Sequence, residues 1–373
     1  MTVLKISGVA DLPLHGGRCP RWLFSKMVKL SKEISETIIL EFGKDEFLRR
    51  ISDPFFFQSF GCVVGFDWHS SGLTTTLTGA LKEAINIEEH GIAICGGKGR
   101  TSRKTLDELE EVGQTFSFSS AKIERLKYTS KIVAKVDSTA IQSGYQLYHH
   151  VFFVDEKGKW AVVQQGMNPV NRYARRYHWL SDEVRSFVVE PNSAIVGDNI
   201  EKAVLNLTSS KSIETQKTMT DISKENPQKI QNMLQELHDR SSTTLMDWIN
   251  PSIKKLEVSH LVMPRNIDWE TVRQLNDKQP SNFEEVLMTN RVGPNTVRAL
   301  ALISNLIYGT QIDWRDPVKY SFCVGGKDGV PFPIDRQAYS NSIKFLKEAI
   351  ESTKIAKEEQ FKALRRLGNL PAK

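Results

Sequence analysis

The segment 145–166, YQLYHHVFFVDEKGKWAVVQQG, constrains the fold more than any other part of the chain. Two runs of aromatic and β-branched residues flank the turn sequence DEKGK, which is typical of a β-hairpin. Successive residues of a strand point to opposite faces, so we expect His149 and His150 on opposite sides of a sheet. The chain therefore needs a sheet, and the two adjacent histidines do not predict a shared metal site.

Helical periodicity surrounds this hairpin on both sides. Apolar residues of the segment 20–42 recur at helical spacing after a proline and stop at Gly43, which predicts a first helix. GIAIC at 91–95 predicts a short strand, and SAKIERLKYTSKIVAKV at 120–136 predicts a long helix. NPVNRYARRYHWLSDEV at 168–184 predicts a basic helix or turn.

The composition changes along the chain. Residues 198–249 are polar and rich in Ser, Thr and Lys, whereas nearly all of 250–373 shows helical periodicity. We therefore expect an α+β protein whose N-terminal part, 1–197, is a mixed α/β domain with a β-hairpin or small sheet. A polar linker or helical connection over 198–249 would join it to an all-α helix-hairpin-helix DNA-binding domain over 250–373.

Charge and cysteine content limit the class of protein. The 373 residues include 50 Lys and Arg against 44 Asp and Glu, and the net charge of +6 favours an anionic partner only weakly. The four cysteines are Cys19, Cys62, Cys95 and Cys323. No Cys-x-x-Cys pair occurs, and no motif predicts a metal or a cofactor. Because no signal peptide or membrane span is apparent, we expect a cytoplasmic protein without membrane contact.

The segment 290–300, NRVGPNTVRAL, places a Gly-Pro turn between two apolar helical runs. Backbone N–H groups at such a turn and at the start of the second helix favour a phosphate, as does the helix dipole. Gly293 permits close approach, and Val292 anchors the turn in the core. A plain αα-hairpin also needs a glycine turn, and this alternative stays open here. The residues predicted to bind nucleic acid in this turn are Arg291, Val292, Gly293, Asn295, Thr296 and Arg298.

This order of elements, followed by GVPFPIDRQAY at 329–339, resembles the helix-hairpin-helix DNA glycosylase superfamily. In that family an aspartate stabilises the positive charge that develops on the sugar as the base leaves, and the resemblance implies this catalytic role for Asp335. The motif usually has a glycine where Arg291 stands. Bifunctional members carry a lysine where Asn295 stands, so the resemblance implies a monofunctional enzyme that does not cleave the strand.

Over its whole length, the chain resembles the prokaryotic family called domain of unknown function 763. The stretches that carry this resemblance are HGGRCPRWL, GCVVGFDWHSSGLTTTLTGALKE, YQLYHHVFFV, KWAVVQQGMN, RRYHW and VGPNTVRALAL. The resemblance implies a family and no particular reaction.

Two further groups of basic residues predict contacts with nucleic acid. CGGKGRTSRKT at 95–105 has the glycines, cations and helix start of an anion nest, without the Gly-Lys-Ser/Thr of a P-loop. Arginines alternate with aromatic residues from Arg172 to Trp179, as on surfaces that stack bases and bind phosphates. The basic residues assigned to such contacts are Lys98, Arg100, Arg172, Arg175 and Arg176.

The hairpin strands and their flanks add amide, hydroxyl and imidazole groups that suit hydrogen bonds to base edges. The predicted base or substrate pocket consists of Gln142, Tyr145, His149, Gln164, Gln165 and His178. A set of buried polar residues that satisfy one another is the alternative. Glutamines stand where a nuclease would place metal-binding carboxylates, which argues against that chemistry on the hairpin.

These features together predict a DNA-binding protein of the DNA-repair type, with nucleic acid, DNA first, as the partner. A monofunctional DNA glycosylase that removes a flipped base, with Asp335 as its catalytic residue, is the preferred activity. The alternatives are a non-catalytic nucleic-acid-binding adaptor and a nuclease with its site in the N-terminal domain.

Overall fold

A computed structural model describes residues 19–66, 70–197, 200–243, 262–318 and 336–370. It combines helices with an antiparallel sheet, which confirms the expected α+β class. The strands are β1 (Ile92–Lys98), β2 (Ile141–Gln142), β3 (Gln146–Asp155), β4 (Trp160–Met167), β5 (Ala174–Leu180), β6 (Ala194–Gly197) and β7 (Leu205–Asn206). The helices are α1 (Arg21–Phe42), α2 (Lys44–Ser52), α3 (Pro54–Val63), α4 (Gly72–Ala84), α5 (Ile87–His90), α6 (Thr105–Thr115), α7 (Ser120–Lys135), α8 (Ile213–Ser223), α9 (Pro227–Thr243), α11 (Trp269–Lys278), α12 (Phe283–Met288), α13 (Pro294–Leu306), α14 (Arg336–Glu351) and α15 (Lys357–Gly368).

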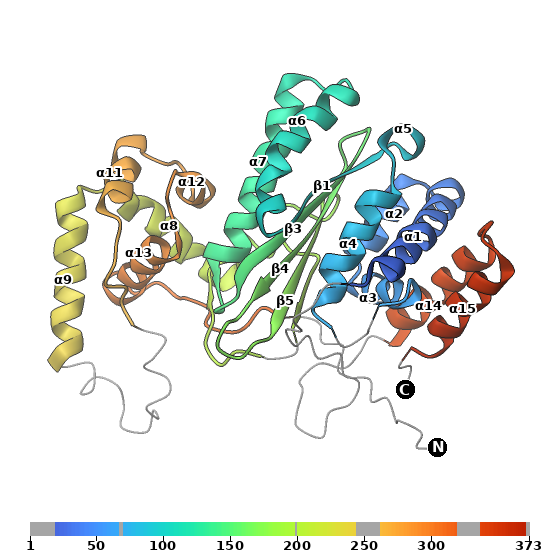
Figure 1. The fold of residues 1–373 in the computed structure, drawn as a ribbon. Helices are drawn as coiled ribbons and strands as arrows, with labels where there is room; N and C mark the ends of the chain where they lie inside the picture. Colours follow the sequence, from blue (N-terminus) through green and yellow to red (C-terminus); the bar gives the residue numbers. More distant parts are fainter. Residues whose placement is uncertain (1–18, 67–69, 198–199, 244–261, 319–335, 371–373) are drawn as a thin grey trace, which may run out of the picture.

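Five strands form one sheet in the order β1-β3-β4-β5-β6, and every neighbouring pair is antiparallel. β2 and β7 form a separate two-stranded sheet. Figure 1 shows the large sheet between two groups of helices, one on either side. The protein is therefore built in three layers, with a helical layer on each face of the sheet.

The first hydrophobic core lies between one face of the sheet and helices α1 to α4, α14 and α15. Val151 and Phe153 of β3 and Val163 of β4 point into it and are buried. The two C-terminal helices are also tied to α3 by polar contacts. Ser342 of α14 donates to the Asp53 carboxylate at 3.2 Å, and Arg366 of α15 donates to the Val63 carbonyl at the C-terminal end of α3, at 2.6 Å.

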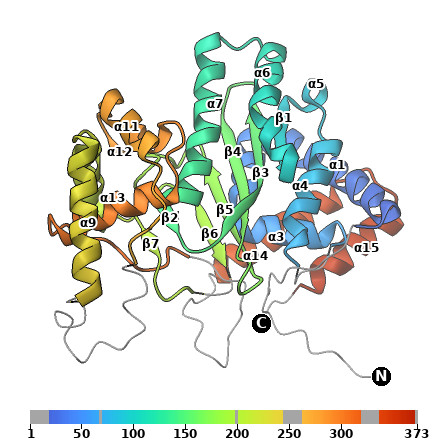
Figure 2. The same cartoon turned by 60° about the vertical axis from the view of Figure 1, so that its left-hand side comes forward.

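The second core lies on the opposite face, beneath α6 to α9 and α11 to α13. Phe152, Trp160 and Trp179 of the sheet share this core with Met219 of α8 and Leu302 of α13. Figure 2 shows α7 standing along the sheet, with α12 and α13 beside it. Among the described helices, none is both long enough and apolar enough to span a membrane.

Strands β3 and β4 confirm the predicted hairpin. The Asp155 carboxylate accepts hydrogen bonds from two backbone N–H groups of the turn, at 2.9 and 2.8 Å, and Gly158 takes the left-handed conformation with φ +82°. His149 and His150 lie on opposite faces, as predicted, because His149 contacts α4 and His150 contacts α7.

The prediction of a basic helix or turn over 168–184 is wrong for the centre of the segment, although residues 169–171 and 181–183 form turns. Residues 174–180 form β5, which pairs with β4 and β6, and every residue of this strand is buried. Leu180 belongs to the first core and Trp179 to the second, so the polar residues of β5 divide between two covered faces. A strand with polar partners on both sides has the mixed composition of an amphipathic helix, and this explains the error.

Residues 200–243, the described part of the segment 198–249 that is predicted to be a polar linker or helical connection, contribute to the second core. They include β7, α8 and α9, and Met219, Ile222 and Leu234 are buried there. Many of its polar residues are also buried, including Thr215, which donates to the Gln311 carbonyl at 2.6 Å. The described part of this segment is therefore packed into the protein and is not an exposed connection.

The helices expected to form one all-α domain over 250–373 divide between the two faces of the sheet. α11 to α13 belong to the second core, together with strand residues, whereas α14 and α15 belong to the first. The predicted boundaries between 1–197, 198–249 and 250–373 therefore do not separate independent cores. Figure 1 shows this division, with α14 and α15 in red across the sheet from the orange helices.

Candidate nucleic-acid interface

In the turn between α12 and α13, an arginine adopts a backbone conformation that is usual for glycine. Arg291 has φ +61°, a left-handed conformation that glycine adopts without strain. Val292 follows, fully buried, and donates its N–H to the Thr289 carbonyl at 3.2 Å. Gly293 is the N-cap of α13 in an extended conformation, and Pro294 occupies the first helical position. The turn is thus tight, anchored and followed directly by a helix start.

Side chains from the sheet layer hold the carbonyl groups of this turn. Lys135, at the end of α7, donates to the Val292 carbonyl, and Gln142 of β2 donates to the Pro294 carbonyl at 2.9 Å. Asn295 donates to the Asn266 carbonyl at 3.0 Å. The N–H groups in the first turn of α13 have no acceptor within the helix, as at every helix start. The carbonyl groups of the turn are therefore held in place. Within the described residues, the N–H groups of Gly293, Asn295 and Thr296 have no acceptor and remain for a ligand.

The predicted residues of the turn fall into two classes. Val292 and Thr296 are buried and support packing, whereas Arg291 and Asn295 are exposed. The Arg291 guanidinium pairs with Asp268 at 2.9 Å, and its side chain remains 60% exposed. Arg298 is half-buried and donates to the Val262 carbonyl at 3.1 Å. Arg291 is thus the predicted cation of this turn that a phosphate reaches most easily.

The predicted anion nest after β1 is a 3-10 turn, Gly99–Lys104, that leads into α6. Lys98 and Arg100 are exposed, as expected. The backbone N–H of Gly96, however, already donates to the Glu108 carboxylate at 2.6 Å, and Lys82 pairs with the same carboxylate at 2.7 Å. The Glu108 carboxylate therefore already occupies one of the N–H groups that we expected to bind an external anion.

A row of polar side chains crosses the first face of the sheet. The strand register aligns His149 with Gln165, and Gln165 with Arg176. Gln165 donates to the Ser71 carbonyl at 2.9 Å, and Arg176 donates to the amide oxygen of Gln58 on α3 at 3.0 Å. All three members of the row are buried beneath the helices. Arg176, predicted to contact nucleic acid, instead binds α3 to the sheet.

The two histidines of this face are neutral. Arg176 donates to Nε2 of His178 at 2.9 Å, so His178 carries its proton on Nδ1, which faces the Ile51 carbonyl at 3.2 Å. Burial, with the neighbouring Arg176 charge, lowers the pKa of His178 well below its usual value. Burial also lowers the pKa of His149 to about 3, and its Nε2 lies 3.0 Å from the Thr78 hydroxyl. Neither imidazole lies in an open pocket.

On the opposite face, the buried carboxylate of Asp137 accepts three hydrogen bonds. The donors are the Gln164 amide at 2.5 Å, the Trp179 indole N–H at 2.8 Å and the Asn192 amide at 2.9 Å. They come from β4, from β5 and from the segment before β6, while Asp137 lies in the π-helical turn after α7. One carboxylate therefore joins four parts of the chain. Its burial raises the pKa of Asp137 to about 7, although the three donors oppose this shift.

The same network fixes the protonation of His150. Gln164 donates its amide N–H groups to Asp137 and to the Val133 carbonyl, so its oxygen faces Nδ1 of His150 at 2.8 Å. That nitrogen must carry the proton, and Nε2 accepts from the Ser130 hydroxyl at 2.8 Å. Burial lowers the pKa of His150 to about 4. Gln164, predicted to line a substrate pocket, thus orders an internal chain of hydrogen bonds.

Arg175 forms a buried ion pair. Its guanidinium donates to the Asp316 carboxylate at 2.6 Å, and both side chains are completely buried. It also lies 4.3 Å from the centre of the Tyr145 ring. Arg175 therefore holds the segment around Asp316 to β5 and does not lie on an exposed surface. Arg172, by contrast, is exposed, in a left-handed conformation with φ +61°.

A single group of ligand-type side chains appears in the described ranges: Glu36, Glu89 and His90 lie with donor atoms within 4.8 Å of one another. Lys32 already pairs with Glu36 at 3.4 Å and with Glu89 at 3.1 Å. An internal cation thus neutralises these carboxylates, and we assign no metal to them.

The structure therefore divides the predicted site. The α12–α13 turn brings Arg291, Gly293 and Asn295 together, and Gln142 reaches the same turn. His149, Gln164, Gln165, Arg175, Arg176 and His178 are internal and bond to one another or to the covering segments, which is close to the alternative of a buried polar set. Nδ1 of His149 and Oε1 of Gln165 have no partner among the described residues. Sequence reasoning missed Asp137, the centre of the second network, because its donors are distant in sequence and no local pattern marks it.

Comparison with known proteins assigns a family. A family model described as "Protein of unknown function (DUF763)" matches residues 8–334. The chain belongs to this family. Neither the curated proteins nor the solved structures gave a match. The predicted catalytic residue Asp335 follows the matched region directly and lies outside the described residues.

Replacement of Asp137 by Asn should remove one component of the pH dependence of stability. The carboxyl ionises near pH 4 when unfolded and near pH 7 when folded, so the folded state binds more protons in this window. The wild-type free energy of unfolding should therefore fall as the pH rises from about 4 to about 7, relative to that of Asp137→Asn. The variant should also lose about 1–3 kcal/mol, because one of its amide N–H groups meets a donor.

Urea unfolding of both proteins at pH 4.5, 6.0 and 7.5 measures this effect. Because the other ionisable groups are common to both proteins, the difference between them isolates Asp137. A difference that does not change with pH would contradict the assignment.

Proposed function

We propose that this chain is a DNA-binding protein of the DNA-repair type that holds the sugar-phosphate backbone with the α12–α13 turn. The observation that carries the proposal is the left-handed Arg291, which is exposed and precedes the buried Val292. This conformation costs an arginine roughly 1–2 kcal/mol relative to a glycine. The charge of this arginine already pairs with Asp268, and we propose that a phosphate is its second partner at the turn.

The proposed contact combines the Arg291 guanidinium with backbone N–H groups at Gly293 and in the first turn of α13. Such donors bind any phosphate of the backbone and read no sequence. Two features support a rigid site. Donors from α7 and β2 hold the carbonyls of Val292 and Pro294, and the buried Val292 anchors the turn in the second core.

We further propose base excision as the chemistry, on the ground of the resemblance to the helix-hairpin-helix DNA glycosylases. Asp335 would stabilise the positively charged sugar as the base departs. The position of the Schiff-base lysine of bifunctional members is held by Asn295, whose amide donates to the Asn266 carbonyl. No amine stands there to form a covalent intermediate, so we expect base release without strand cleavage.

Gly293→Asp should weaken DNA binding without unfolding the protein. Gly293 has φ −133°, which any residue adopts, and an added Cβ would meet only the Arg291 carbonyl, at 3.8 Å. Aspartate is a favourable N-cap, so the stability of the variant should be retained. Its negative charge would, however, repel a phosphate at the N–H groups.

Gly293→Asn is the matched control, since it has nearly the same shape and is also a good N-cap, but carries no charge. Fluorescence anisotropy with labelled single-stranded and double-stranded DNA across a salt series should show salt-dependent binding by wild type. Affinity should fall about tenfold or more in the Asp variant relative to the Asn variant, the size of a lost charge-assisted contact. Equal affinities of the two variants would show that the turn does not contact phosphates and serves only in packing.

Asp335→Asn separates base excision from binding alone. If Asp335 acts as proposed, the variant should bind DNA as wild type does and lose at least about a hundredfold in base release from damaged duplexes. The readout is alkali-sensitive strand breakage of a panel of modified duplexes. Binding without base release by either protein would support the adaptor, and strand cleavage that requires a divalent metal would support the nuclease.

A further inference from the structure

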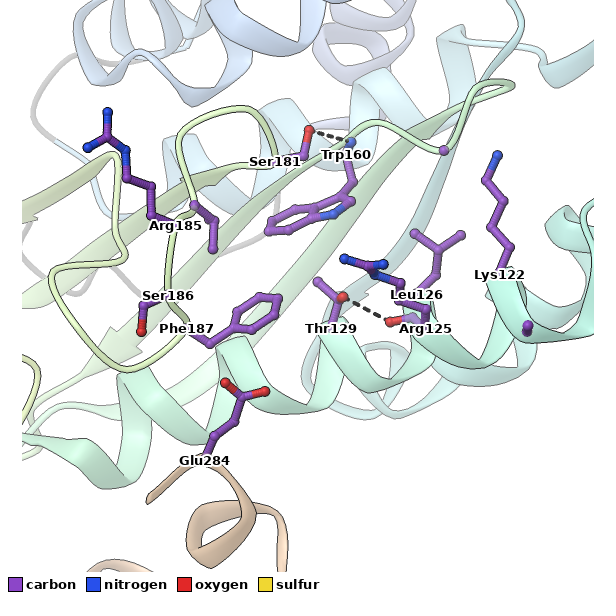
Figure 3. A pocket seen from close by; sticks show the side chains of 13 residues that line it. Lys122, Arg125, Leu126, Thr129, Trp160, Ser181, Arg185, Ser186, Phe187 and Glu284 are labelled. Atoms are coloured by element: carbon purple, nitrogen blue, oxygen red, sulfur yellow. Dashed lines mark hydrogen bonds between the residues drawn. The ribbon is translucent and has the colours of Figure 1, made fainter. Parts of the chain in front are cut away.

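A pocket of about 680 Å³ lies between α7, the loop after β5 and the start of α12, apart from the residues predicted to form a site. Its volume is in the range of small-molecule sites. Figure 3 shows side chains from all three elements around it. The pocket combines an aromatic wall, two arginines and one carboxylate, and none of these had a role in the functions predicted from the sequence.

The aromatic wall is formed by Trp160 and Phe187. Their ring centres are 6.4 Å apart, with the planes inclined by only 14°. Trp160 also packs on Phe152 at 5.6 Å, and Phe187 packs edge-on to Tyr128 at 6.4 Å. The wall is therefore held from behind by the second core. Because Trp160 is only 8% exposed, a flat ligand would stack mainly on the half-buried Phe187, with the edge of Trp160 beside it.

Two guanidinium groups remain for an anionic ligand. Over the described part of the chain, neither Arg125 nor Arg185 forms a hydrogen bond or ion pair through its guanidinium, and both side chains are exposed. Figure 3 shows Arg125 pointing from α7 toward Trp160 and Phe187, whereas Arg185 turns outward at the rim. The ammonium of Lys122, by contrast, already donates to a backbone carbonyl at 2.7 Å. Arginine forks of this kind bind phosphates through paired hydrogen bonds.

The carboxylate of the pocket comes from Glu284 on α12. One of its oxygens accepts the Tyr128 hydroxyl at 2.5 Å, which fixes the orientation of the group. In Figure 3 the carboxylate lies beside the Phe187 ring. Its second oxygen provides an acceptor next to the aromatic wall, where an amino or hydroxyl group of a stacked ligand would lie.

We infer that this pocket binds one nucleotide, with its base against Trp160 and Phe187 and its phosphate at Arg125. A flat ring with exocyclic donors and an attached phosphate matches all three kinds of group in the pocket. The nucleotide comes either from a DNA strand or from the free mononucleotide pool. The first source rests on the proposed function, and the second does not.

The position of the pocket relative to the turn favours a strand. Tyr128 of α7 contacts Glu284 at the start of α12, and Lys135 of α7 contacts Val292 after its end. Arg125 and Lys135 are ten residues apart on one helix, a distance of about 15 Å. The pocket and the α12–α13 turn thus lie at opposite ends of the contact between α7 and α12, so one DNA strand could reach both.

Arg125→Gln and Phe187→Leu test the inference on the full chain, by isothermal titration with dAMP and with a single-stranded 12-mer. Lys131→Gln is the matched control, because it removes the same charge from an exposed position of α7 outside the pocket. We expect each pocket variant to weaken binding about tenfold and the control to bind as wild type. Deoxyadenosine, which lacks the phosphate, should bind equally to wild type and Arg125→Gln.

The outcomes distinguish the two sources and the two proposals. Binding of dAMP that Arg125→Gln weakens supports a free nucleotide, whereas weakening of the 12-mer alone supports a nucleotide within a strand. If strand binding is lost in Gly293→Asp but unchanged in both pocket variants, and dAMP does not bind, the pocket inference is overturned and the turn stands. If the pocket variants weaken binding and Gly293→Asp does not, the proposal that the turn binds DNA is overturned and the pocket inference is supported. Absence of all binding overturns both.

Discussion

Both faces of the five-stranded sheet are covered by helices, and the polar side chains of its strands must therefore find their partners inside the protein. This constraint determines much of the structure. Arg176 bonds to α3, Arg175 pairs with Asp316, and the Asp137 carboxylate gathers donors from three other segments. A buried charge or amide without a partner would cost several kcal/mol, so each of these contacts fixes the position of one element against the sheet.

The same constraint makes the α12–α13 turn a rigid part of the molecule. Its carbonyl groups accept donors from α7 and β2, which belong to the layer on the sheet, and Val292 is buried with strand residues in the second core. A turn held in this way presents its backbone N–H groups in one orientation. Preorganised donors of this kind bind a phosphate without the cost of ordering a loop. The proposed function therefore depends on the packing of the sheet as well as on the turn itself.

The sequence predicted the features that local patterns determine. The β3–β4 hairpin follows from two apolar runs around Asp155 and Gly158, the end of α1 from Gly43, and the tight turn before α13 from Gly293 and Pro294. The opposite placement of His149 and His150 follows from the period of a strand.

Features that depend on contacts between distant segments were not predicted from the sequence. β5 looked like a basic helix because its arginines are satisfied by partners more than a hundred residues away, such as Gln58 and Asp316. The placement of α14 and α15 on the face opposite α13 is a matter of which core their apolar sides enter, and an amphipathic pattern does not specify that. The pocket was missed for the same reason, since Arg125 and Trp160 meet only in the folded chain.

Hydrogen exchange of the full chain, with and without DNA, tests the central claim most directly. If the α12–α13 turn binds the backbone, the amides of Gly293, Asn295 and Thr296 should exchange more slowly in the complex, because they would donate to phosphates, while the central strands remain unchanged. Slower exchange in the loop 181–187 as well would extend the bound strand to the pocket. Unchanged exchange at Gly293, Asn295 and Thr296 in a complex that slows exchange elsewhere would contradict the claim, and the binding surface would then have to be sought at the segments that do respond.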